Sequence, residues 1–365
     1  MTQRIRFAII GWGWRAEFFH RIATLVPDRF EITGVLLRSE DKAAALRAET
    51  GLPVVTNLDD LIADTPEFVV LSIARGATGP YLKQLFDRQI PVLSETPPGE
   101  TPEELADLWE HAQRTNAKVQ VAEQYPFQPL YAAWLKAIGQ GLIGEVQNIT
   151  ISALHGYHGT AMIRRVLGID ASENCRVSAV KDTFKLTETM GRGGPVFDGE
   201  IVDSSRVHAR FEFESGKIAY FDFSDPAQYH SFIRTRQLNI QGTRGEIDDL
   251  GVRYLADGNV PVTLDLNRID QGVYNNQEWA HIAIFLGERE LYRNPFTYAR
   301  LNDDEIAIAA CLDAMSHYVK TGEDFYSLRD ALQDTYLAQL MELSISSGSE
   351  SGTQAVLDTQ PMPWQ

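Results

Sequence analysis

The sequence predicts an α/β protein in which a parallel-sheet domain precedes an α/β domain built on a mainly antiparallel sheet. Two observations predict this class. Up to residue 121, short β-rich runs alternate with helical runs, which is typical of βαβ units on a parallel sheet. From residue 127 onward, longer runs alternate apolar and polar residues with period two. We therefore expect two domains, 1–126 and 127–365.

Six short runs are expected to form the parallel sheet: 5–10, 31–37, 54–55, 68–73, 92–94 and 119–122. Helical spacing of apolar residues over 19–26 predicts a helix after the first strand. Gly51 is placed to end the next helix. Thr101 is expected to cap a later helix, with Glu104 reaching back to complete a capping box.

In the second domain, a helix is expected over 130–138, followed by long strands. A run in which alternate residues, from Val207 to Phe213, point to one face is followed by a hairpin turn at 214–217 and a returning strand, 218–223. Further expected strands are 237–241, 247–254 and 261–266, and two helices, 303–321 and 328–347, close the chain.

Composition and charge exclude several classes of protein. Of 365 residues, 44% are hydrophobic and 23% charged, as in globular proteins. The net charge of −17 repels a phosphate backbone, so we expect no nucleic-acid partner. Gly11 and Gly13 interrupt the N-terminal apolar run too early for a signal peptide, and no run is long enough to span a membrane. We expect a cytoplasmic protein.

Two cysteines, Cys175 and Cys311, lie far apart and offer neither a disulfide framework nor a metal-ligand spacing. Two buried thiols in a reducing compartment are the favoured interpretation, and we expect no metal site.

The first strand leads directly into Gly11-Trp12-Gly13-Trp14-Arg15-Ala16 and then a helix. Gly11 permits a tight turn, Gly13 lets the backbone approach a pyrophosphate, and Ala16 allows close helix packing. Because the helix N-terminus faces the anion, the segment predicts a dinucleotide site.

The end of the second strand should contact the adenosine ribose. Leu37, Arg38 and Ser39 stand there, without a carboxylate to accept from a 2′-hydroxyl. Arg38 can instead pair with a 2′-phosphate, so among NAD(P) cofactors we expect NADP. The alternative is that Arg38 stacks on adenine, which permits either cofactor.

The chain resembles the Gfo/Idh/MocA family of glucose–fructose oxidoreductase and inositol dehydrogenase in five segments: 8–16, 92–97, 121–129, 141–146 and 329–348. The resemblance implies a Rossmann domain, a second domain with an open sheet, and NAD(P)-linked redox chemistry on a sugar, polyol or related alcohol. It also implies a homodimer or homotetramer joined through that sheet. We expect cofactor contacts from Gly11, Gly13, Trp14, Arg15, Arg38, Ser39, Ala74, Glu95, Thr96 and Gln124.

Two positions depart from the family pattern. Thr96 stands where the family's Glu-Lys-Pro motif supplies a lysine for proton transfer. Ala161, three residues after His158, stands where the family has an aspartate. The usual proton-transfer groups are therefore missing.

Hydride transfer from an alcohol still needs a base, and the catalytic candidates are His158, Tyr125 and His155. The segment 154–159 has two glycines beside two histidines, which suggests a loop kept open for a ligand. We expect His158 to take the proton while Tyr125 holds the same oxygen. The alternative is that both histidines are structural.

Three further side chains are weighed. Arg164 or Arg165 either binds a substrate carboxylate or phosphate or belongs to a solvated face, and His230 is a candidate for the cleft.

Two functions stay open: an oxidoreductase acting on CH–OH groups, and a regulator or sensor that kept the cofactor site and lost the chemistry.

Overall fold

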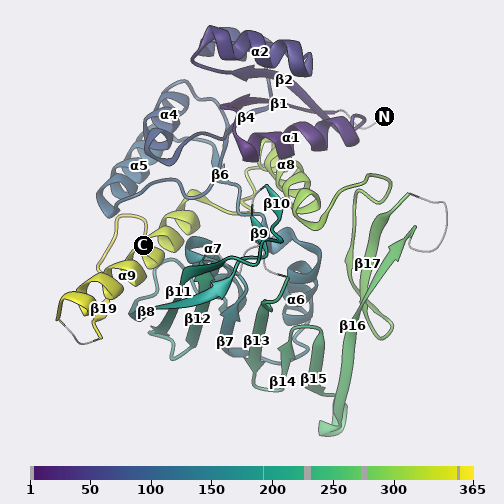
Figure 1. Cartoon of the computed structure of the whole chain (residues 1–365), viewed down its shortest axis with the longest axis vertical. Coiled ribbons are helices and arrows are strands. Elements are labelled where there is room, and N and C mark those ends of the chain that lie inside the picture. Colours follow the sequence, from purple (N-terminus) through teal and green to yellow (C-terminus); the bar gives the residue numbers. More distant parts are fainter. Residues whose placement is uncertain (1–3, 192, 226–231, 273–277, 352–353) are drawn as a thin grey trace.

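The computed structural model describes residues 4–191, 193–225, 232–272, 278–351 and 354–365. Within them the chain forms a parallel sheet covered by helices and, below it in Figure 1, a long and mainly antiparallel sheet. The predicted fold class is confirmed.

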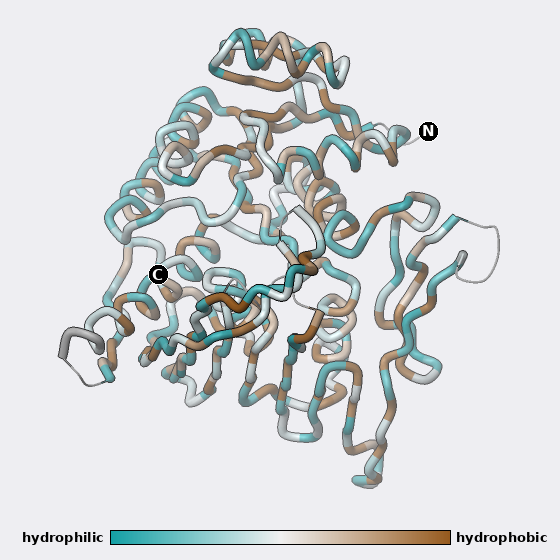
Figure 2. The backbone as a smooth tube through the Cα atoms, in the orientation of Figure 1, coloured by the Kyte–Doolittle hydropathy of each residue, from teal (hydrophilic) through white to brown (hydrophobic). Residues whose placement is uncertain are grey.

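The parallel sheet has the strand order β3-β2-β1-β4-β5-β6 of a doubly wound fold. Its strands are β1 (Ile5–Ile10), β2 (Phe30–Leu36), β3 (Val54–Val55), β4 (Phe68–Leu71), β5 (Val92–Ser94) and β6 (Val119–Val121). The helices between them are α1 (Trp14–Leu25), α2 (Glu40–Thr50), α3 (Leu58–Ile62), α4 (Arg75–Asp87) and α5 (Pro102–Thr115). These strands are almost wholly buried, and β2 beneath α2 is correspondingly hydrophobic in Figure 2. Since the strands are parallel, the residues that follow each of them gather at one edge.

Helix termini follow the predicted chemistry with one difference. Gly51 ends α2 in the left-handed conformation, at φ 71°. Thr101 caps α5 by accepting from the Glu104 amide at 3.3 Å. The Glu104 carboxylate, however, accepts from the backbone N–H of Glu100 instead of Thr101. The expected capping box is therefore only half formed, because the carboxylate reaches one residue further back.

In the part of the chain that the structure describes, the second sheet has eleven strands in the order β18-β17-β16-β15-β14-β13-β7-β12-β11-β8-β19. Its central strands are β7 (Val146–Ser152), β8 (Cys175–Thr187), β11 (Ile201–Phe213), β12 (Ile218–Asp225) and β13 (Gln237–Gly242). The outer strands are β14 (Gly245–Asp248), β15 (Gly251–Leu255), β16 (Pro261–Gln271), β17 (Ala280–Leu286), β18 (Arg289–Arg293) and β19 (Val356–Asp358). A short hairpin, β9 (Met190–Gly191) with β10 (Gly194–Pro195), stands apart. Within the long sheet, neighbouring strands pair antiparallel, except that β7 and β12 run parallel.

The predicted β11–β12 hairpin is confirmed, with Ala209, Phe211 and Phe213 buried on one face. The strand expected over 247–254 is wrong: β14 and β15 form a hairpin there. Asp249 turns the chain with a positive φ of 51°, and its carboxylate accepts from the Leu238 amide. That turn is fixed by β13, a neighbour that local periodicity does not show.

The longer helices described in the rest of the chain are α6 (Pro129–Gly139), α7 (Gly156–Leu167), α8 (Asp303–Thr321) and α9 (Leu328–Ser351). Helix α7 packs on β7, and α9 contacts both β8 of the long sheet and β6 of the first. Helix α8 returns to the parallel sheet, where Ile306 and Leu312 pack into the core formed by Phe7 and Phe19. The division into domains 1–126 and 127–365 stays a prediction, because α8 completes the core of the first sheet.

Candidate active site

The glycine-rich turn after β1 fits a pyrophosphate. Gly11 has φ +94°, and a Cβ there would lie 2.2 Å from the carbonyl oxygen of Ser72, so only glycine fits. A Cβ at Gly13 would meet nothing within 4 Å, so the space above this backbone is open. Gly13 precedes α1, and no side chain caps this helix start, so the positive end of the helix dipole can face an anion.

At the end of β2, Arg38 is exposed and Leu37 half-buried. Ser39, an expected cofactor contact, caps α2 by accepting from the Lys42 amide at 3.4 Å. The next carboxylate, Glu40, pairs with Arg47 on the same helix. The structure thus leaves the guanidinium of Arg38 facing solvent at the expected ribose position.

Arg15 links the dinucleotide turn to two carboxylates. Its guanidinium lies 3.0 Å from Asp304 of α8 and 3.9 Å from Glu95. Burial alone would lower the pKa of Arg15, but the two carboxylates outweigh it and keep that pKa above its ordinary value. Trp14, at 45% exposure, lies beside the Arg15 guanidinium. Gln124 is buried, and with its side-chain amide turned so that both polar atoms are satisfied, the oxygen accepts from Arg15 at 3.2 Å.

A pocket of about 430 Å³ lies where the edge of the parallel sheet meets α7 and α9. It is lined by Arg75, Thr96, Pro97, Gly99, Glu100, His155, Gly156, Tyr157, His158, Thr335, Ala338, Gln339, Met341 and Glu342. Ala74 lies next to this pocket as the exposed residue before α4. Burial raises the pKa of Glu95 to about 7. Gln339 also lines the pocket, and both of its amide atoms are buried without a hydrogen-bond partner.

The three predicted catalytic residues come together beside this pocket. The ring of His158 lies 4.8 Å from that of Tyr125 and 4.7 Å from that of His155. Burial lowers the pKa of His158 to about 3 and that of His155 to about 2. Burial also raises the pKa of the Tyr125 phenol. All three side chains are therefore uncharged near neutral pH.

Sequence reasoning missed Glu123, which lies 2.6 Å from Nδ1 of His158. Both groups are buried, with Glu123 at 1% exposure. Burial raises the pKa of the carboxyl well above its ordinary value. A hydrogen bond at Nδ1 orients the ring and leaves Nε2 available to a ligand. A glutamate directly after an apolar strand was the available signal in the sequence.

The open loop expected over 154–159 is wrong. Helix α7 starts at Gly156, directly after His155, and His158 stands in its first turn. A Cβ on Gly159 would lie 2.4 Å from the ring of Phe221, so this glycine lets α7 pack closely on the sheet. Gly159 therefore permits close packing and does not indicate an open loop.

Arg164 neither binds a free anion nor lies on a solvated face. It is buried and pairs with Asp334 at 2.8 Å and Asp330 at 3.1 Å. Arg165 is exposed. His230 lies outside the described residues.

Among the described residues, no group of three His, Cys, Asp or Glu side chains is arranged to hold a metal ion. Both cysteines are free and buried. None of the described helices is long and apolar enough to cross a membrane.

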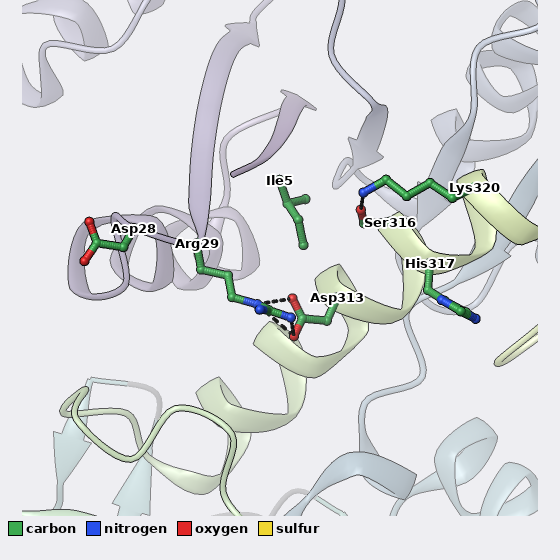
Figure 3. A pocket seen from close by; sticks show the side chains of 7 residues that line it. All are labelled: Ile5, Asp28, Arg29, Asp313, Ser316, His317 and Lys320. Atoms are coloured by element: carbon green, nitrogen blue, oxygen red, sulfur yellow. Dashed lines mark hydrogen bonds and ion pairs between the residues drawn. The ribbon is translucent and has the colours of Figure 1, made fainter. Parts of the chain in front are cut away.

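Another pocket, shown in Figure 3, lies at the start of β1, at the opposite edge of the parallel sheet. Arg29 there is engaged with Asp313 of α8 through both carboxylate oxygens. That pocket therefore lies where α8 packs on the first sheet, away from the glycine-rich turn at Gly11.

Residues 5–123 match the model of an oxidoreductase family with an NAD-binding Rossmann fold, GFO_IDH_MocA. Two uncharacterized oxidoreductases of Schizosaccharomyces pombe are 29% and 30% identical over 146 and 148 residues. Each alignment covers 39% of this chain and 40% of the relative, so the match spans under half of either protein.

Solved structures share the whole fold at low identity. Levoglucosan dehydrogenase, in complex with NADH and levoglucosan, is 16% identical, with a TM-score of 0.68 over 98% of this chain and 100% of that one. A myo-inositol dehydrogenase from Corynebacterium glutamicum is 15% identical, with a TM-score of 0.65 over 98% and 100%. The resemblance that the motifs indicate is thereby confirmed over residues 5–123, which match the NAD-binding Rossmann fold of the Gfo/Idh/MocA oxidoreductase family.

Proposed function

We propose that this protein is an NAD(P)-dependent oxidoreductase that interconverts a secondary alcohol of a sugar or polyol and the corresponding ketone. The observation that carries the proposal is the buried Glu123–His158 pair, 2.6 Å apart, beside the pocket that Thr96 lines. It supplies an acid/base group near the position where the family's lysine is missing. Levoglucosan and myo-inositol, the compounds named for two structural neighbours, are both polyhydroxylated, which supports the substrate class.

A bound nicotinamide supplies the hydride acceptor or donor. In the oxidation, Nε2 of His158 takes the hydroxyl proton, and the Glu123 carboxylate stabilises the imidazolium through Nδ1. Burial raises the pKa of the Tyr125 phenol, so this group stays protonated and donates a hydrogen bond to the same substrate oxygen. His155 packs against His158 and orients it. In the reduction the same proton moves in the opposite direction.

The residues present fit a dinucleotide. Gly11, Gly13 and the uncapped start of α1 would hold the pyrophosphate, and Arg38 would face the 2′-position of the ribose. We infer a preference for NADP(H), because Arg38 is exposed and no carboxylate follows β2 directly. A charge-assisted contact contributes roughly 1.5–3 kcal/mol, so the preference should be about tenfold or more. Calorimetry with both cofactors tests this, and equal affinities, or no change in Arg38→Ala, would refute it.

We also propose a cytoplasmic homodimer or homotetramer joined through the long sheet. Val180 and Tyr220 support this, because both are large apolar residues exposed on the sheet, at 39% and 45%. Light scattering combined with gel filtration measures the mass in solution, and a monomer would contradict the assembly.

A sensor that binds the cofactor without turnover is the second candidate, and the loss of a titratable group at Thr96 favours it. The deciding experiment incubates the protein with NADP⁺ or NAD⁺ and a panel of sugars and polyols, and follows nicotinamide absorbance. We expect turnover that His158→Ala lowers about 10²–10⁴-fold while cofactor affinity stays unchanged. Tight cofactor binding without turnover on any compound of the panel would favour the sensor.

A further inference from the structure

A directed chain of hydrogen bonds leads away from the candidate active site. The Tyr157 hydroxyl donates to the Tyr326 hydroxyl at 3.0 Å, which donates to the Asp334 carboxylate at 2.5 Å. All three side chains are buried, at 7%, 6% and 1% exposure. The two donors point the same way, so a proton that enters at Tyr157 can shift stepwise to Asp334.

The two ends of this chain lie at different pockets. Tyr157 lines the pocket that also contains His158. Tyr326 and Asp334 line another pocket, of about 330 Å³, together with Arg164 and Asp330. The three groups therefore cross the protein wall between the candidate active site and a second opening.

We propose that Tyr157, Tyr326 and Asp334 form a proton relay that carries the proton of each alcohol oxidation from the Glu123–His158 pair to the second pocket. This inference rests on the function proposed above. Oxidation breaks one C–H and one O–H bond; the hydride goes to the nicotinamide, and one proton must leave. Tyr157 and Tyr326 each accept a proton at the hydroxyl oxygen and donate their own proton to the next group in the chain. Asp334 accepts the last proton and releases it to water.

The surroundings of the relay suit this role. The Tyr157 ring lies 5.3 Å from that of His158, in the same pocket wall. After burial, the Glu123 carboxylate is the largest cause of the raised pKa of Tyr157. Burial, opposed by Arg164, raises the pKa of Asp334 to about 6, where it can accept and release a proton near neutrality. Arg164, Asp330 and Tyr326 are the charged and titratable groups that face it.

A relay is needed because the pair that takes the substrate proton, Glu123 and His158, is buried. Glu123 and His158 are both buried, and a bound substrate and cofactor would cover the pocket that opens beside them. The proton then requires a second exit. The structural alternative is that these groups only tie α7 to α9, for which the Arg164–Asp334 ion pair suffices.

Tyr326→Phe separates the two roles, since it removes the middle hydroxyl and leaves the Arg164–Asp334 ion pair intact. Tyr336→Phe is the matched control: this buried tyrosine of α9 uses its hydroxyl to accept from the backbone N–H of Gln360, outside the relay. With the substrate found by the panel, we expect Tyr326→Phe and Asp334→Asn to lower kcat about tenfold or more without raising KM. We also expect raising the concentration of a small buffer such as imidazole to restore part of that rate. Wild-type kcat in Tyr326→Phe, or a loss that buffer does not relieve, would overturn the relay.

A second readout needs no substrate. The proton between His158 Nδ1 and Glu123 can be observed by NMR of protein with ¹⁵N-labelled histidine, saturated with NADPH or NADH. We expect its exchange with water to slow at least fivefold in Tyr326→Phe and to stay unchanged in Tyr336→Phe. Unchanged exchange in Tyr326→Phe, or the absence of the bridging proton in the wild type, would overturn the relay. A panel without turnover would count against the proposed function alone, and the exchange measurement would then decide about the relay.

Discussion

Replacing Glu123 by glutamine isolates the charge in the buried pair. The amide has the volume of the carboxyl, and its oxygen can still accept from Nδ1 of His158 across the 2.6 Å contact. It cannot offset the positive charge that develops on the imidazole when Nε2 takes the substrate proton. The variant therefore tests electrostatic support with little change in packing.

The size of the effect follows from the burial of both groups. A hydrogen bond to a charged group contributes about 1.5–3 kcal/mol net. Since about 1.4 kcal/mol corresponds to a tenfold change in rate, kcat/KM for the oxidation should fall about 10–150-fold. Cofactor affinity should not change, because the proposed pyrophosphate site at Gly11 and Gly13 does not include Glu123.

The pH dependence gives a second signature. Oxidation needs the pair without its extra proton, and burial raises the pKa of Glu123 well above its ordinary value. Wild-type kcat/KM for oxidation should therefore rise with pH through the apparent pKa of the pair, and the reduction should fall over the same range. In Glu123→Gln the imidazole is the one titratable group left of the pair, and because burial lowers the pKa of His158, its contribution to the profile should be flat near neutrality.

The assay is steady-state nicotinamide absorbance from pH 5 to pH 9, with urea unfolding of each variant. Glu305→Gln is the control, because this glutamate is also buried, at 4% exposure, but pairs with Arg21 and the amide of Asn302. It should leave kcat/KM and its pH profile unchanged. If Glu123→Gln retained the wild-type rate and profile, the pair would have no part in proton transfer.

Three further changes test the framework around the site. Gly11→Ala would place a Cβ 2.2 Å from Ser72 O at φ +94°, so we expect about 1–3 kcal/mol less stability in urea unfolding and loss of cofactor binding by calorimetry. Arg164→Met leaves the Asp334 carboxylate buried without its partner, and the free energy of unfolding should fall by about 3–5 kcal/mol; a neutral result would show that Asp334 is protonated in the fold. Thr101→Ala removes the cap of α5 and should cost about 1 kcal/mol by thermal unfolding, whereas Thr101→Ser should not.

The positions of the parallel strands, the turn at Gly11 and the helix ends at Gly51 and Thr101 could all be predicted from sequence. Each depends on interactions between residues close in the chain: buried β-rich runs, a positive φ that only glycine tolerates, and a side chain that caps an amide three residues on. The clashes that a Cβ would make with Ser72 at Gly11 and with Phe221 at Gly159 come from distant segments, so local sequence could not show them; at Gly159, which has no positive φ, no local signal remained.

The chemistry of the site was decided by contacts between distant segments. Glu123 and His158 are 35 residues apart, Arg15 and Asp304 289, and Arg164 and Asp334 170. Sequence alone identified His158 and Tyr125 as candidates, since residue type limits which groups can carry a proton. Only the tertiary structure paired His158 with Glu123 and joined Tyr157 to Asp334, because the protonation of a group is set by its burial and by the charges that folding brings beside it.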